Sequence, residues 1–325
     1  MTRRAPNTSA PAGRMIPIGR HRLHALDRGT AGDLPTVVFE SGLVSPLQSW
    51  SWVQGDLAAR TRTISYERAG TGWSEPGPAP RSVPRLAEEL RALLTALEVT
   101  GPVVLVGHSF GGLVVRCFAG SHPQHVAGVV FADSLHAEEL RRSSMQRRGM
   151  AWLEQSLKLS ALQAFLRLGR RELDDQFTEL PTADAAHARA RLHLPGVYRA
   201  AAAELVAWKN ADPAQVATEA FPPDVPVGVV VSGRSLRNDI THRKLQEELL
   251  TLSSDAFAAT AADADHFELV LDRKQSTVVT EAVSRVLDRL ADRHASAPAG
   301  SGIARTDAAG ANVHEAGTEG SNVAP

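Results

Sequence analysis

The chain has 325 residues, of which 43% are hydrophobic, and its 35 basic and 36 acidic side chains leave a net charge of −1. This length is enough to bury one large core or two smaller ones. The balanced charge argues against a nucleic acid or an anionic membrane as the main partner, because either would favour a concentrated basic face. The single cysteine, Cys117, excludes an intramolecular disulfide and a cysteine-based zinc site.

The two ends of the chain differ in composition from the middle. Residues 1–14 and 295–325 are rich in small and polar side chains without hydrophobic periodicity, so we expect flexible tails there. The amino-terminal stretch carries arginines but lacks the apolar core of a signal peptide, and no segment is apolar over a length that spans a bilayer. We therefore expect a cytoplasmic location.

Between the tails, short β-like runs alternate with helical patterns, which predicts an α/β fold with a mostly parallel central sheet flanked by helices. Its two parts would be residues 15–136 and 214–294. The apolar spacing predicts helices over 84–97 and 274–290. The expected strands are 22–26, 36–40, 63–66, 103–106, 126–131, 227–231 and 256–261.

The alternation breaks over residues 137–213, where Leu, Ala, Arg and Glu dominate and no strand pattern occurs. We interpret this stretch as a helical insertion, whose two ends emerge at the carboxyl edge of the sheet, where ligands bind in open α/β folds. It is a candidate lid over the substrate pocket. We expect apolar positions such as Trp152, Leu162 and Phe165 to contact the remote part of the substrate.

The pentapeptide Gly107-His108-Ser109-Phe110-Gly111 follows the apolar run 102–106 directly. A serine between small residues at a strand-to-helix turn is typical of an exposed nucleophile, because the strained turn needs small neighbours two positions away. Ser109 is therefore the candidate nucleophile. Since a serine hydroxyl needs a base, we look for a histidine at the same sheet edge.

His266 is the candidate base, because it lies in the loop after the last predicted strand and before the terminal helix. A loop in that place ends at the same edge of the sheet as Ser109. His108 is closer in sequence, but we expect it to point away from the nucleophile. No histidine spacing resembles a metal site.

Three segments in this order resemble signatures of the α/β-hydrolase superfamily: residues 36–43 its oxyanion strand and loop, 66–74 the loop that follows, and 107–112 its nucleophile elbow. With His266, the resemblance covers residues 20–290. It is strongest to the lidded serine esterase and proline-iminopeptidase-like branch. The resemblance implies an α/β-hydrolase fold with a helical lid insertion.

The resemblance also implies that the backbone N–H groups of Leu43 and Phe110 form an oxyanion hole. Two positions depart from the family pattern. Ser41 stands where the oxyanion loop usually has histidine, and Leu236 stands where the acid of the triad is usually found. The acid is then Asp133, at the end of the strand after the elbow, or Asp239, in the later loop. We favour Asp133, because Asp239 is also well placed to cap a following helix.

These residues predict a serine hydrolase that cleaves a small, moderately apolar ester, or a thioester, lactone or amide, through an acyl-enzyme intermediate. The same triad could serve a C–C hydrolase or a perhydrolase, and a non-catalytic ligand-binding protein could keep the fold. A serine nucleophile argues against dehalogenases and epoxide hydrolases, which the resemblance associates with aspartate. No metal or organic cofactor is required, and a small-molecule substrate is the expected partner. The sequence indicates neither the substrate's acyl and leaving groups nor the oligomeric state.

Overall fold

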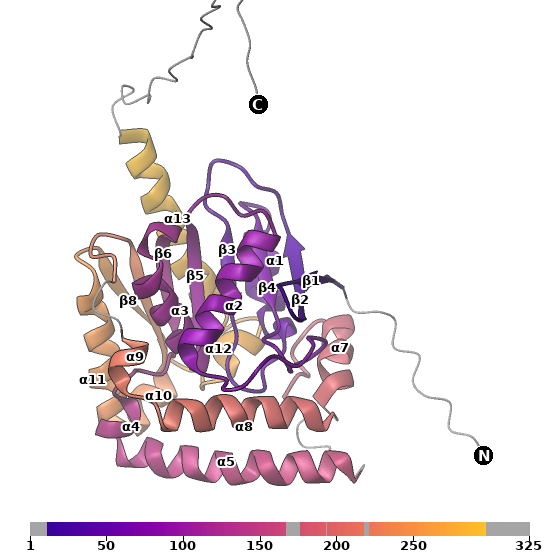
Figure 1. The fold of residues 1–325 in the computed structure, drawn as a ribbon. Coiled ribbons are helices and arrows are strands. Elements are labelled where there is room, and N and C mark those ends of the chain that lie inside the picture. The colour runs from indigo at the N-terminus through magenta and orange to yellow at the C-terminus, as the bar shows by residue number, and fades with distance from the viewer. Residues whose placement is uncertain (1–11, 167–175, 193, 218–220, 297–325) are drawn as a thin grey trace, which may run out of the picture.

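The computed structural model describes residues 12–166, 176–192, 194–217 and 221–296. Most of both predicted tails, 1–14 and 295–325, lies outside the described residues. Within them, an eight-stranded sheet has the order β1-β2-β4-β3-β5-β6-β7-β8, with helices on both faces (Figure 1). The predicted α/β class with a mostly parallel sheet is confirmed.

The strands from β4 to β8 in this order are parallel, whereas β1 and β2 run antiparallel to their neighbours. The seven predicted strands all form, with ends that shift by at most two residues. Their observed bounds are β2 Arg22–Arg28, β3 Val37–Glu40, β4 Thr63–Tyr66, β5 Val103–His108, β6 Val126–Ala132, β7 Val227–Ser232 and β8 Ala256–Ala261.

Strand β1, Arg14–Pro17, is a correction to the predicted tail, which was expected to extend to residue 14. It pairs antiparallel with β2, so Arg14 lies opposite Ala25. The strand is too short to show a period of two, and its proline is tolerated because the strand lies at the edge of the sheet. A single buried side chain, Ile16, anchors it to the core.

Alternate side chains of the central strands enter different hydrophobic cores on the two faces of the sheet. In β5, Val103 and Leu105 belong to one core, and Val104 and Val106 to the other, as the period of a strand requires. Helices α2 (Val83–Ala96) and α3 (Phe110–Ser121) cover the first face, and α1 (Ser51–Leu57), α12 (Glu268–Leu271) and α13 (Thr277–Ser296) cover the second. The sheet is thus buried on both sides.

Between β6 and β7, the residues that the structure describes form helices and no strand. The longest two, α5 and α8, lie side by side across one end of the sheet (Figure 1). Helix α8 packs on the start of α3, where the rings of Trp208 and Phe110 are 6.1 Å apart. The bounds are α4 Glu139–Arg142, α5 Ser144–Phe165, α7 Thr182–Leu192, α8 Pro195–Lys209 and α9 Pro213–Val216.

The segment after β7 contains α10 (Gly233–Asn238) and α11 (Ile240–Leu249), and short 3₁₀ turns occur at Leu47–Trp50, Pro123–His125 and Leu250–Leu252. These helices bring side chains to the same sheet end as α4 and α5. Among the described helices, none combines the length and the apolar character needed to cross a membrane.

Candidate active site

Ser109 occupies a strained turn between β5 and α3. Its φ of 53° and ψ of −122° lie in a region that non-glycine residues rarely adopt. The glycines on either side are required by space: a Cβ at Gly107 would lie 2.7 Å from a methyl group of Val115, and one at Gly111 only 2.3 Å from the carbonyl oxygen of Glu40. The strand and the helix therefore approach closely enough to hold the Ser109 backbone in this conformation.

Asp133 follows β6 directly, and its Oδ2 lies 2.8 Å from Nδ1 of His266 in the loop after β8. The hydroxyl of Ser235 donates to the same oxygen at 2.7 Å, and the backbone N–H of Ser232 donates to Oδ1 at 3.3 Å. Asp133 is buried and its φ is 43°. Burial by itself would raise the pKa of Asp133, but the hydrogen bonds and charges of His242 and His266 lower it well below the usual range.

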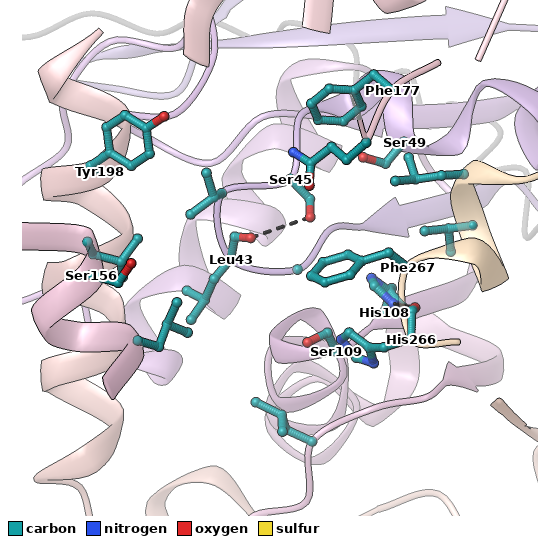
Figure 2. Close-up of a pocket in the computed structure, with 18 of the residues that line it drawn as sticks. Leu43, Ser45, Ser49, His108, Ser109, Ser156, Phe177, Tyr198, His266 and Phe267 are labelled. Carbon is teal, nitrogen blue, oxygen red and sulfur yellow. Dashed lines mark hydrogen bonds between the residues drawn. The ribbon is translucent and has the colours of Figure 1, made fainter. Parts of the chain in front are cut away.

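Ser109 and His266 line one cavity of about 270 Å³. Figure 2 shows the two side chains next to each other at its edge, with Phe267 beside them and Ser156 and Tyr198 across the opening. Most of the remaining wall is apolar, and Gly42, Ser45, Ser49, His108, Ser160 and Gln176 complete it. The apolar residues are Leu43, Val44, Leu135, Met150, Leu153, Leu157, Phe177, Val270 and Leu271. A second cavity of similar volume shares Ser109 and His266 and continues between Gln146 and Asn238.

The loop after β3 passes close to Ser109, because a Cβ on Gly42 would lie 3.2 Å from Cβ of Ser109. The carbonyl of Gly42 accepts a hydrogen bond from Nη2 of Arg68 at 3.0 Å. In a trans peptide, the C=O and N–H groups point in opposite directions, so this bond also fixes the direction of the Leu43 N–H. Phe110 is the first residue of α3, where backbone N–H groups have no partner within the helix.

Arg68 is the centre of a buried ion cluster that joins this loop to the helical insertion. Its guanidinium contacts Glu40 at 2.6 Å and Glu204 of α8 at 2.9 Å, and it donates to the carbonyl of Ser41 at 2.5 Å. The hydroxyl of Tyr66 donates to Glu40 as well. Burial works against the charge of Arg68, yet Glu204 and Glu40 outweigh it and raise its pKa. The planar fork of arginine suits such a multiply bonded position.

Ser41, the first departure from the family pattern, accepts a hydrogen bond from Nε1 of the buried Trp50 at 3.0 Å. It therefore anchors the loop with a hydroxyl. At the second departure, near Leu236, the segment of Ser232 and Ser235 provides no acid but donates hydrogen bonds to Asp133.

Asp239, the alternative acid, is bound to other partners. It is the N-cap of α11, accepting from the backbone N–H groups of Thr241 at 2.9 Å and His242 at 3.2 Å, and its other oxygen accepts from the hydroxyl of Ser143 at 2.9 Å. Its carboxylate is thus committed to the first turn of the helix. Asp133 is the one of the two candidates that the structure brings to His266.

His108, which we expected to point away from the nucleophile, contacts the candidate base. Its ring stacks on that of His266 at 4.6 Å, and its Nε2 donates to the backbone oxygen of His266 at 2.9 Å. His108 is the last residue of β5, and its side chain lies between the loop after β3, which contains Gly42, and the loop after β8, which contains His266. Burial, followed by the charge of His266, lowers the pKa of His108 to about 3. A neutral His108 therefore supports the loop of His266.

The expected contact residues of the insertion need a second correction. Trp152, Leu162 and Phe165 are 72%, 53% and 70% exposed and do not line the cavity. The apolar α5 residues that do line it, Met150, Leu153 and Leu157, recur at helical spacing on the opposite face. Composition alone did not distinguish the two faces, because α5 carries apolar residues on both.

Residues 35–223 match the family model for the alpha/beta hydrolase fold, so the chain belongs to this family. The resemblance seen in the sequence is confirmed at that level. The match includes the Ser109 turn, Asp133 and the whole insertion, residues 137–213, whereas His266 lies beyond its end.

Individual proteins that match the chain have low sequence identity to it. A protein of Hormonema carpetanum named probable transporter efuK is 28% identical over 220 residues, which are 65% of this chain and 30% of that protein. The chain therefore spans less than a third of that relative. Among solved structures, a thermophilic esterase from Thermogutta terrifontis matches with a TM-score of 0.62 and 20% identity, covering 86% of this chain and 99% of the esterase. An enol-lactonase from Burkholderia xenovorans gives 0.62 and 20%, covering 85% and 100%. At such identities, the likeness shows the fold alone.

Proposed function

We propose that this protein is a serine hydrolase that cleaves a small, moderately apolar ester, or a related thioester, lactone or amide, through an acyl-enzyme intermediate. The observation that carries the proposal is the constellation at one cavity: Ser109 on a strained turn beside His266, whose Nδ1 lies 2.8 Å from the buried Asp133. Nucleophile, base and orienting acid in this order are the parts that acyl transfer needs.

In the proposed reaction, Oγ of Ser109 attacks the substrate carbonyl while Nε2 of His266 takes the hydroxyl proton. Asp133 accepts the Nδ1–H of His266 and so fixes its tautomer. His266 then gives the proton to the departing alcohol, and the acyl group stays on Ser109. Water attacks this ester with His266 again as base, which releases the acid and restores the hydroxyl.

The proposed oxyanion donors are the backbone N–H groups of Leu43 and Phe110. The first belongs to the peptide that Arg68 holds through the Gly42 carbonyl, and the second is in the first turn of α3, where N–H groups have no partner within the helix. Removing one such donor costs about 10²–10³ in rate in related chemistry. Because both are backbone groups, their placement depends on the loop and on the turn.

The cavity favours an acyl group of modest size. Its volume of about 270 Å³ is slightly below the usual range for small-molecule pockets, which begins at about 300 Å³. The side chains of Leu153, Leu157 and Phe177 offer apolar contact without a charged partner for a substrate carboxylate. A small-molecule substrate is the proposed partner, and the cytoplasmic location stays a prediction.

The test combines a panel of p-nitrophenyl esters of increasing acyl length with a fluorophosphonate probe. We expect turnover and labelling in the native protein, and loss of both in Ser109→Ala. Ser156→Ala removes another hydroxyl of the same cavity and should keep the label. Residual turnover of Ser109→Ala above about one part in a thousand would contradict the nucleophile assignment.

Two other outcomes separate the alternatives. Labelling without ester turnover would favour a C–C hydrolase or a perhydrolase, which use the same triad. Absence of both labelling and turnover in the folded native protein would favour a non-catalytic ligand-binding protein on the hydrolase fold.

A further inference from the structure

Asp133 lies between two imidazoles. Its Oδ2 faces Nδ1 of His266 at 2.8 Å, and its Oδ1 lies 3.5 Å from Nε2 of His242 in α11. His266 borders both cavities with Ser109, whereas the largely buried His242 lines only the second of them, together with Asp133. The mechanism described above uses one of these histidines and gives no role to the other.

His242 also contacts a second carboxylate, on the side away from Asp133. Its Nδ1 lies 2.9 Å from Oε1 of Glu139 in α4. Glu139 is fully buried, and its other oxygen accepts from the backbone N–H of His136 at 3.0 Å. Glu139, His242, Asp133 and His266 thus form a row of alternating carboxylates and imidazoles, which ends at the cavity that His266 shares with Ser109.

This arrangement decides the protonation state of His242. A neutral imidazole has one N–H, so one of its nitrogens would present a lone pair to a buried carboxylate. An imidazolium has two N–H groups, so it can donate one to Glu139 and face Asp133 with the other, whose nitrogen lies 3.5 Å from Oδ1 and has no hydrogen-bond partner among the described residues. Burial alone would lower the pKa of His242, but the hydrogen bonds and charges of Asp133 and Glu139 outweigh it and raise the pKa to about 10.

We propose that His242 is a positioning residue of the active site, which as a permanent imidazolium holds the far oxygen of Asp133 and limits the negative charge that His266 experiences. The inference rests on the proposed serine-hydrolase function. One oxygen of Asp133 then faces the fixed cation, His242, and the other accepts a hydrogen bond from the reacting base, His266. The orientation of Asp133 is set from both ends of the carboxylate.

The direction of the effect follows from the charges that surround His242. They are Asp133 after β6, Glu139 on α4, Asp239 at the start of α11, and the neighbouring His136 and His266. His136 is kept neutral at pH 7, because burial and then the charge of Arg116 lower its pKa to about 4. Removal of the imidazolium leaves Asp133 and Glu139 without a cation beside them, so the negative charge next to the reacting base increases and we expect the acid limb of the activity profile to move to higher pH.

The experiment is the pH profile of kcat/KM for His242→Gln with a p-nitrophenyl ester. We expect the acid limb to move up by about one pH unit and kcat/KM at pH 7 to fall about 10-fold to 100-fold. His136→Gln is the matched control, because it changes a buried histidine of the same region whose ring contacts Arg116 rather than Asp133. It should leave the limb in place, and His242→Lys, which keeps a cation there, should restore most of the shift.

An acid limb in His242→Gln that coincides with that of the native protein would overturn the proposal. Should this variant fail to fold, Glu139→Gln combined with His242→Gln removes one anion together with the cation, and the same profile is measured on it. Nitrogen-15 NMR of the native protein gives a readout without catalysis: we expect His242 doubly protonated at pH 8, and a neutral ring there contradicts the inference. If the native protein shows no ester turnover at all, the proposed function is overturned instead.

Discussion

Two buried ion clusters border Ser109, and they end in different ways. The Asp133 cluster, made of Glu139, His242, Asp133 and His266, ends on a side chain that borders the cavity. The Arg68 cluster, made of Glu40, Arg68 and Glu204, ends on the backbone carbonyls of residues 41 and 42. The first can therefore act on a proton, whereas the second can act only on the shape of a loop.

The clusters also share a feature. Each receives one fully buried carboxylate from the helical insertion: Glu139 from α4 and Glu204 from α8. A buried charge without its partner is strongly destabilising. The insertion therefore belongs to the charge balance of the site, in addition to forming a wall of the cavity.

The largest expected effect tests the end of the Asp133 cluster nearest the base. Asp133→Asn should lower kcat by about 10²–10⁴, because an amide stabilises neither the correct tautomer of His266 nor its protonated form. Asp239→Asn should cost less than about tenfold, since asparagine is an equally good cap for α11. Both variants are measured on one ester.

The reverse result has a clear meaning. If Asp239→Asn is inactive while Asp133→Asn is nearly normal, the acid follows the later strand β7. The distinction between the two clusters would then be wrong, because the Asp133 cluster would not orient the reacting base.

The next effect tests the Arg68 cluster. Arg68→Lys should lower kcat by about 10-fold to 100-fold, because one ammonium cannot replace a fork that serves two carboxylates and two carbonyls, and the Leu43 N–H loses its fixed direction. The acid limb of the pH profile should stay in place, in contrast to His242→Gln. The measurement is a pH profile together with the thermal midpoint, which should fall.

Arg22→Lys is a suitable control for that variant. Arg22 also bonds a glutamate with its guanidinium, but this pair with Glu75 lies on the surface, where ion pairs contribute little to stability because solvent screens them. We expect native kinetics and a nearly native midpoint. A shifted acid limb in Arg68→Lys would show that the Arg68 cluster reaches the base as well, and the proposed division between the clusters would be wrong.

The sequence predicted most of the frame because apolar periodicity and turn chemistry are local. The strand-to-helix turn at Ser109, the late loop of His266 and the end of the strand before Asp133 were all located from short segments. Strand β1 was missed because four residues at an edge carry too little pattern.

The clusters could not be predicted because their partners are distant in the sequence. Glu204 lies 136 residues from Arg68, and His242 lies 103 residues from Glu139. One signal of these clusters was present in the sequence, which is that Glu40 and Glu204 each stand inside an apolar stretch. A charged side chain in such a place must have a buried partner. Which partner it has depends on the packing of the insertion on the core.

The smallest expected effect lies outside both clusters, on helix α5. Leu153 lines the cavity, whereas Leu162 is on the solvent face of the same helix. Leu153→Ala enlarges the space for the remote part of the acyl group, so we expect the ratio of kcat/KM for octanoate over acetate to rise about threefold to tenfold. Leu162→Ala is the matched control and should leave that ratio unchanged. Both are measured with the same p-nitrophenyl esters. A uniform change on all esters in Leu153→Ala would mean that α5 acts through the clusters rather than through direct contact with the substrate, because binding energy from a remote contact is available only to an acyl chain long enough to reach it.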